Sequence, residues 1–455
     1  MKYNTITLDC GMRVIHLPSS SQVVYLGIAV GAGTRHEQPG EEGLAHFCEH
    51  LTFKGTSRRS AVQIINALEG VGGELNAFTN KEDTVYYAAI ARQHVVRAVD
   101  VLCDIVFHSE YPQHEVEKEC EVVCDEIESY EDSPAELIYD EIENLLFAGH
   151  PLGHNILGTA SQLRRYTSDD ARRFTRCHYR PDRCVFFVSG DVDFGKLIKT
   201  LQNKETLQTL PQETLPQPLP VREGSGHILP IGECCDNQSG VLSSGEYTDC
   251  KSIYSPPSQG GVGGGSLAGW VGGGSLFIRH RGTHQAHVML GARAYAAVDS
   301  RRWGLYLLNN LLGGPGMNSR LSLSLRERRG LVYTVESTTV SYSDAGMWCV
   351  YFGCDPDDVK RCLRLVRGEL DRLIRRPLTE RQLRQAKQQI EGQLTIASDN
   401  REQFALDFAK NFLHHGTERD LNDIMRHIWQ LTAADLQQVA TEIFAPDRII
   451  TLIYE

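Results

Sequence analysis

The sequence lacks the stretches that mark a membrane protein or an exported precursor. None of its 455 residues belongs to a run of 18 consecutive apolar residues, so we expect no membrane span. Residues 1–10 contain neither an apolar core nor a cleavage-site pattern, so they do not resemble a secretion signal. We therefore expect a cytoplasmic chain with no membrane partner.

Positive charge is also scarce. Lys and Arg together number 46 against 58 Asp and Glu, which gives a net charge of −12. A chain with this balance repels phosphate backbones, so nucleic acid is excluded as a general partner. Hydrophobic residues make up 41% and charged residues 23%, which is a globular balance, and the length favours two domains or more.

The 13 cysteines do not follow the spacing of a disulfide framework. Their number is odd, and several lie inside apolar runs, as Cys103 and Cys184 do. Without a secretion signal we expect them to be reduced and mostly buried as small hydrophobic side chains. Cys234 and Cys235 are adjacent, but no second cysteine or histidine pair stands at zinc-site spacing.

Residues 204–275 lack the periodicity of a helix or a strand. This segment is rich in Pro near residues 211–220 and in Gly and Ser near residues 259–266, which predicts a flexible linker or insertion, disordered in large part. Residues 263–265 are three glycines without a following Lys-Ser/Thr, so they do not form a phosphate loop.

The linker divides the chain into predicted domains at residues 1–203 and 276–455. In both, expected strands are followed by a helix, more strands, further helices and a final strand, which is a coarse repeat of architecture. We predict an α+β protein with two similar domains, each a mainly antiparallel sheet packed against helices.

The most informative motif is His-x-x-Glu-His at residues 46–50. On a helix His46 and His50 are one turn apart, so both imidazoles leave the same face and can bind one Zn²⁺. Glu49 reaches that face without being a ligand, where a general base for a zinc-activated water must stand. The alternative is a helix with two surface histidines.

A zinc site of this kind needs a third protein ligand and one open position for water. Residues 113–130 predict a helix with a buried stripe of Val116, Cys120, Val123 and Ile127. Glu119 and Glu126 lie two turns apart on the same edge of that stripe. Either carboxylate could serve, and spacing alone does not choose between them.

Taken together, these segments resemble the pitrilysin/insulinase family of zinc peptidases. The resemblance rests on the His46–His50 motif, on residues 53–56 (Phe-Lys-Gly-Thr), on residues 73–77 (Gly-Glu-Leu-Asn-Ala) and on the helix at 113–130, in that order. Within the family, the chain is most similar to the half-length bacterial members that resemble mitochondrial processing peptidase. The likeness covers about 1–200 and 276–455.

The resemblance implies a role for several further residues. It implies zinc bound by His46, His50 and Glu126, and support of the site by Glu119 from outside the ligand sphere. It assigns Asn76 and Ala77 to an edge strand that pairs with the substrate backbone. It also matches Arg326 and Tyr333 to a pair that holds the substrate and the reacting carbonyl; without the family, they are an ordinary arginine at a helix end and an ordinary strand tyrosine.

The function that follows is a zinc metallo-endopeptidase, a hydrolase that cleaves peptides or unfolded polypeptide segments. The resemblance further implies that the chain is half of a clamshell chamber, and we expect a homodimer in which Arg326 and Tyr333 complete the partner's site; a heterodimer with a homologue is the variant of this arrangement. A non-catalytic peptide-binding or scaffold subunit is the alternative, and a zinc-storage protein is a third. The intact motif favours the enzyme.

Overall fold

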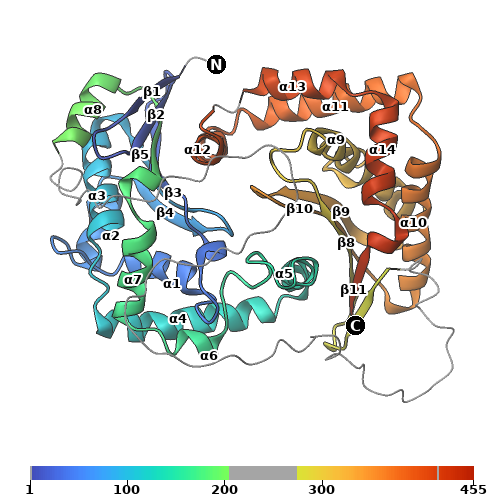
Figure 1. Ribbon diagram of the computed structural model, residues 1–455, viewed down its shortest axis with the longest axis horizontal. Helices are drawn as coiled ribbons and strands as arrows, with labels where there is room; N and C mark the ends of the chain where they lie inside the picture. Colours follow the sequence, from blue (N-terminus) through green and yellow to red (C-terminus); the bar gives the residue numbers. More distant parts are fainter. Residues whose placement is uncertain (1–2, 204–273, 418–419) are drawn as a thin grey trace, which may run out of the picture. The chain divides into compact units, whose positions relative to one another are not determined.

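The computed structural model describes residues 3–203, 274–417 and 420–455 (Figure 1). These residues form two β-sheets, each with helices packed against it. The predicted linker at 204–275, with its cysteine pair and its three glycines, lies outside the described residues except for its last two positions. The predicted domain boundaries therefore stay predictions.

The first sheet has six strands in the order β1-β2-β6-β3-β5-β4. All neighbours are antiparallel except β2 and β6, which run parallel. The strands are β1 (Asn4–Thr7), β2 (Arg13–Pro18), β3 (Val23–Val30), β4 (Glu74–Thr79), β5 (Thr84–Ala91) and β6 (Cys184–Gly190).

The second sheet repeats this plan with five strands in the order β7-β11-β8-β10-β9. Its last strand in the sequence, β11, runs parallel to β7, as β6 does to β2 in the first sheet, and the remaining neighbours are antiparallel. The strands are β7 (Leu276–Arg279), β8 (Ala286–Ala294), β9 (Val332–Ser341), β10 (Gly346–Cys354) and β11 (Ile450–Tyr454). The predicted α+β class with two similar, mainly antiparallel domains is confirmed.

One face of each sheet is covered by helices from its own half of the chain, because alternate strand residues are apolar and buried on that face. In the first half these are α1 (Leu44–Thr52), α2 (Ala61–Glu69), α3 (Val95–His108), α4 (Gln113–Glu131), α6 (Ala160–Leu163), α7 (Ser168–His178) and α8 (Phe194–Gln202). In the second half they are α9 (Arg302–Gly313), α10 (Val359–Arg375), α11 (Glu380–Ala397), α13 (Leu421–Gln430) and α14 (Ala433–Ile443).

The opposite face of each sheet is covered by a helix from the other half. Helix α12 (Arg401–His415) buries Phe408 and Phe412 against β3 and β6 of the first sheet. Helix α5 (Pro134–Leu146) buries Ile138 and Ile142 against β8, β10 and β11 of the second sheet. The two halves therefore share core residues, and neither sheet has both faces covered by its own helices alone.

Two further expectations concern cysteines and membranes. Ten cysteines lie in the described residues; all are free thiols, and eight of them are buried, as expected. Among the helices that the structure describes, none combines the length and the apolar character needed to cross a bilayer.

Candidate metal centre

The helix that carries the His-x-x-Glu-His motif is held firmly at its N-terminal end. Gly43 precedes α1 with a φ of +91°, a conformation that favours glycine, and a Cβ there would meet the carbonyl oxygen of Leu157 at 2.6 Å. The carboxylate of Glu37 accepts hydrogen bonds from the amides of Gly43 (3.0 Å) and Ala45 (2.7 Å), and it also bonds to Nε2 of His154 at 2.9 Å. An acidic group at this position is favoured by the helix dipole.

Helix α1 is buried on nearly all sides, but one face is apolar and another carries polar side chains. Leu44, Phe47, Cys48 and Leu51 pack in the core under the first sheet. The remaining positions direct His46, Glu49 and His50 away from that core, toward β4 and α4, which both contact α1. The i, i+4 spacing thus places both imidazoles on one face, as the sequence predicts.

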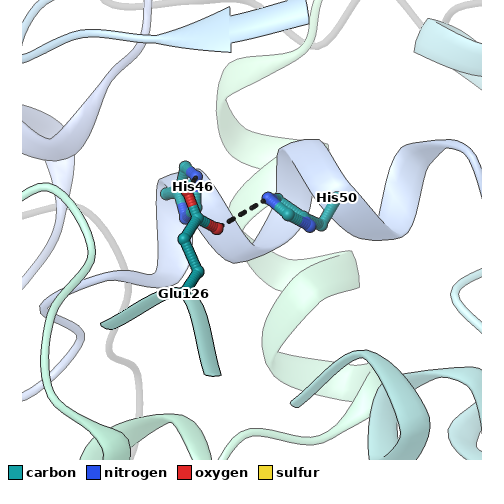
Figure 2. Close-up of side chains that lie close together, drawn as sticks. All are labelled: His46, His50 and Glu126. Carbon is teal, nitrogen blue, oxygen red and sulfur yellow. Dashed lines mark ion pairs between the residues drawn. The ribbon is translucent and has the colours of Figure 1, made fainter. Parts of the chain in front are cut away.

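His46, His50 and Glu126 converge (Figure 2). Nε2 of His50 lies 3.4 Å from Oε2 of Glu126, and Nε2 of His46 lies 3.9 Å from Oε1 of the same carboxylate. One ligand atom from each of the three residues falls within 4.8 Å of the others. Among the described residues, these three form the only group of His, Cys, Asp or Glu with that geometry.

The structure distinguishes the two carboxylates of α4 that spacing left open. Glu126 points its oxygens at the Nε2 atoms of both histidines, whereas Glu119 contacts the opposite nitrogen of His50, with Oε1 at 2.9 Å from Nδ1. Lys54 in turn places Nζ 2.6 Å from Oε2 of Glu119. Glu119 is thus positioned to orient the ring of His50 while Glu126 shares the face of the candidate ligands.

The protonation of the two histidines differs because their surroundings differ. Burial, together with the nearby His50, lowers the pKa of His46 to about 4, so its imidazole is neutral at pH 7. Burial also opposes the charge of His50, but its hydrogen bonds with Glu119 and Glu126 outweigh this effect and raise its pKa to about 9. A proton on Nε2 of His50 points at Glu126, where a metal cation bound by both groups would replace it.

These residues fit a zinc ion. A tetrahedral ion with ligands at about 2.0–2.2 Å sets neighbouring ligand atoms about 3.3–3.6 Å apart, and the 3.4 Å between His50 and Glu126 matches that value. Two imidazole nitrogens and one carboxylate oxygen are also a donor set that zinc enzymes use.

Glu49 lies beside this group and is itself almost fully buried, at 8% exposure. Its Oε2 accepts a hydrogen bond of 2.5 Å from the hydroxyl of Thr79, the last residue of β4. Burial raises the pKa of Glu49, while the Thr79 hydroxyl opposes that rise by stabilising the carboxylate. Thr79 has no role that the sequence predicts, and Lys54 counts only as part of the segment 53–56, because a hydroxyl and an ammonium carry no spacing signal.

The two residues expected on a substrate-binding strand lie in β4, at the free edge of the first sheet in the described part of the chain. Asn76 and Ala77 pair with Tyr87 and Tyr86 of β5 on one side only. The other side of β4 has no partner strand among the described residues, so its backbone can pair with an extended peptide. The strand ends at Thr79, which ties this edge directly to Glu49.

Arg326 and Tyr333 lie elsewhere. Arg326 sits in a short π-helical turn (Ser322–Glu327), where its guanidinium pairs with neighbouring Glu327 at 2.9 Å. Tyr333 is in β9 and is 86% exposed. In the regions that the structure describes, neither side chain forms a hydrogen bond or ion pair with the residues of the metal group.

Comparison with known proteins agrees with this geometry. The family model described as Insulinase (Peptidase family M16) matches residues 13–160, and the one described as Peptidase M16 inactive domain matches residues 271–390. An uncharacterized zinc protease of Streptomyces coelicolor is 32% identical over 439 residues, which cover 96% of this chain and 86% of that protein. The uncharacterized zinc protease YmxG of Bacillus subtilis is 31% identical over 452 residues, covering 98% and 97%.

Solved structures show the same fold. A protease from Helicobacter pylori superimposes with a TM-score of 0.82 at 21% identity, covering 100% of this chain and 99% of that one. The structure titled peptidase M16 inactive domain from Pseudomonas fluorescens gives a TM-score of 0.79 at 17% identity, with 100% and 98% coverage. From its matches along nearly the whole length, the chain belongs to the insulinase family of peptidases, M16, and to its members of about 450 residues.

Proposed function

We propose that this protein is a zinc metallo-endopeptidase that hydrolyses peptides or unfolded polypeptide segments. The observation that carries the proposal is the convergence of His46, His50 and Glu126 with Glu49 buried beside them. Relatives named zinc proteases, which match nearly the full length, support the metal and the reaction class.

In this proposal each residue of the centre has one task. His46, His50 and Glu126 hold the zinc, which when bound acts as a Lewis acid that polarises a carbonyl and acidifies water. Glu119 accepts a hydrogen bond from the protonated Nδ1 of His50 and so keeps the lone pair of Nε2 directed at the metal position. Lys54 neutralises the second oxygen of Glu119 and holds that carboxylate in place.

Glu49 is the general base and later the general acid. Its carboxylate takes a proton from the attacking water and delivers one to the leaving amine. Burial raises its pKa, which makes it a better proton acceptor than an exposed carboxylate, and Thr79 fixes the orientation of one oxygen. The free edge of β4, with Asn76 and Ala77, pairs with the substrate backbone next to this base.

The second part of the proposal is a dimer. In the described part of the chain, Arg326 and the exposed Tyr333 form no hydrogen bond or ion pair with the metal group, so we assign them to the site of a partner subunit. There Tyr333 donates a hydrogen bond to the developing oxyanion and Arg326 holds the substrate. Two such chains would form a chamber that admits only unfolded or short substrates.

The test is cleavage of a quenched-fluorescent basic peptide, with the zinc content measured in the same samples. Wild type, Glu49→Gln and the control Glu69→Gln, which changes an exposed glutamate at the end of α2, are compared. We expect zinc in all three proteins and turnover in wild type and Glu69→Gln only. Zinc without turnover in any of them would favour a non-catalytic binding subunit, and absence of zinc would refute the metal site.

A further inference from the structure

A cavity whose lining includes none of the metal group's residues collects positive charge. It has a volume of about 560 Å³ and lies where β2, the loop after β3 and the start of β6 meet the end of α12. Three arginines line it, Arg13, Arg35 and Arg183, together with His36. Glu82 is the one carboxylate among its lining residues. Such a concentration of cations is notable in a chain with a net charge of −12.

Two nearby carboxylates, Glu82 and Asp344, both form ion pairs with Arg35. Glu82 accepts a hydrogen bond from Nη1 of Arg35 at 2.7 Å, and both of its oxygens also bond to Ser343, from the hydroxyl at 2.6 Å and from the amide at 3.0 Å. Asp344 forms a two-pronged pair with the same Arg35, with one contact of 2.7 Å. Arg35 is therefore paired with two carboxylates, which together carry one negative charge more than Arg35 offsets, and neither of them forms an ion pair with Arg13 or Arg183 within the described residues.

Arg13 and Arg183 have no acidic partner among the described residues. Arg13 donates from Nη1 and Nη2 to the carbonyl oxygens of Phe412 and Leu413, at 3.1 and 3.2 Å, which are neutral acceptors at the end of α12. Burial lowers the pKa of Arg13, which reflects the cost of keeping its charge there. Arg183 contacts only the ring nitrogen of His178, at 3.4 Å. A guanidinium has five N–H donors, so both retain unused ones.

His36 adds a neutral donor to these cations. Its Nδ1 accepts a hydrogen bond from the amide of Gly33 at 3.1 Å, so the proton of the neutral ring is on Nε2. Burial, Arg35 and Arg183 lower the pKa of His36, and burial, His36 and Arg183 lower that of His178 to about 4. His36 is therefore held in its neutral form, mainly by burial, and keeps one ring N–H as a donor.

We propose that this cavity binds a small anion that carries a phosphate group. The two arginines without acidic partners each offer charged donors to an anion, and guanidinium groups bind phosphate oxygens through paired N–H donors. The Nε2 proton of His36 supplies a further donor. Residues of β2 and of the end of α12 both line the cavity, so a bound anion would lie close to both elements.

Isothermal titration calorimetry on the full chain, at constant ionic strength in chloride buffer, tests the proposal. The probes are inorganic phosphate and glycerol 3-phosphate, with acetate as the comparison anion. We expect each phosphate compound to bind saturably with a stoichiometry of one per chain, and we expect no binding of acetate. Tighter binding of inorganic phosphate would identify the free ion as the ligand, and tighter binding of glycerol 3-phosphate would identify a phosphoester. A native-state ligand also raises the unfolding temperature as its concentration rises.

Variants locate the binding. Arg183 is exposed at the rim and has one weak contact, so Arg183→Gln should fold and should weaken binding at least tenfold, while Arg183→Lys should retain part of the affinity. The matched control Arg176→Gln removes the same charge from α7, outside the cavity lining, and should bind like wild type. Absence of saturable binding, or equal affinities in all of these proteins, would overturn the proposal.

Discussion

The hydrogen bond from Thr79 to Glu49 makes a sharp prediction about the pH dependence of catalysis. Thr79→Val removes the hydroxyl at nearly constant shape, so Glu49 loses its 2.5 Å donor and gains no new contact. A hydrogen bond to an ionised group contributes about 1.5–3 kcal/mol. Removing it should raise the pKa of Glu49 further above its ordinary value by about one to two units.

The sign of the effect follows from the role of the base. Glu49 must be deprotonated to accept a proton, so a higher pKa shifts the acid limb of the profile of kcat/KM against pH upward by about one to two units. Well above that limb the loss of activity should be small, and the zinc content should not change. The assay is peptide cleavage across the pH range with zinc measured in each sample.

A matched control comes from helix α7. Thr175 is also a buried threonine, but its hydroxyl donates to the carbonyl oxygen of Ala171 at 2.8 Å rather than to Glu49. Thr175→Val should therefore affect stability without moving the acid limb. An unchanged acid limb in Thr79→Val, or an equal shift in both variants, would refute the assignment of Glu49 as a base oriented by Thr79.

Three further predictions address the metal, stability and assembly. Glu119→Gln should weaken zinc binding about 10–100-fold, measured by competition with a chromogenic chelator, while Glu128→Gln, an exposed change on the same helix, should not. Burial raises the pKa of Asp140 to about 6, so its stabilising contribution is full below about pH 4 and is lost as the pH rises through 6. Asp140→Asn should therefore raise the free energy of unfolding, measured by denaturant titration, by up to about 3 kcal/mol at pH 8 and by little at pH 4. A gain in stability that is independent of pH would contradict this. If a partner subunit completes each site, mixing inactive Glu49→Gln with inactive Tyr333→Ala should recover about a quarter of the wild-type rate. The reason is that half of the randomly formed dimers contain one chain of each variant, and one of the two sites in such a dimer is intact. No recovery of activity would place Tyr333 in its own chain's site.

Much of the local structure could be predicted from the sequence because its signals are local. The β-rich run at residues 23–30 coincides with β3, and the periodic segment at residues 113–130 coincides with α4 to within one residue. The buried stripe of that helix is also as expected, since Val116 and Val123 are almost inaccessible to solvent. Hydrophobic patterns of period 2 and 3.6 show which side of a strand or helix is buried, and the burial of that side is what stabilises these elements.

What spacing could not decide was how two helices face each other. Glu119 and Glu126 lie on one edge of α4, so either fits a rule based on sequence separation. Their different contacts with His50 arise from the rotation of α4 relative to α1, which no local pattern encodes. The family resemblance favoured Glu126 as the ligand, and the geometry places that residue, and not Glu119, near the Nε2 atoms of both histidines.

The exchange of helices between the halves was not predicted for a related reason. An amphipathic pattern shows that α12 has an apolar face, but it does not show which sheet that face covers. Phe408 and Phe412 pack on the first sheet although about 220 residues of chain separate them from β6. Tertiary partners at such sequence separation are chosen by shape and burial across the whole fold.

The measurement that tests the central claim most directly is the position of zinc in crystals of the zinc-loaded protein, from anomalous scattering at the zinc absorption edge. The account predicts one strong peak within about 2.0–2.2 Å of nitrogen atoms of His46 and His50 and an oxygen of Glu126, with Glu49 near the metal but outside its ligand sphere. A peak that Glu49 ligates, a peak elsewhere in the molecule, or no peak at all would contradict it.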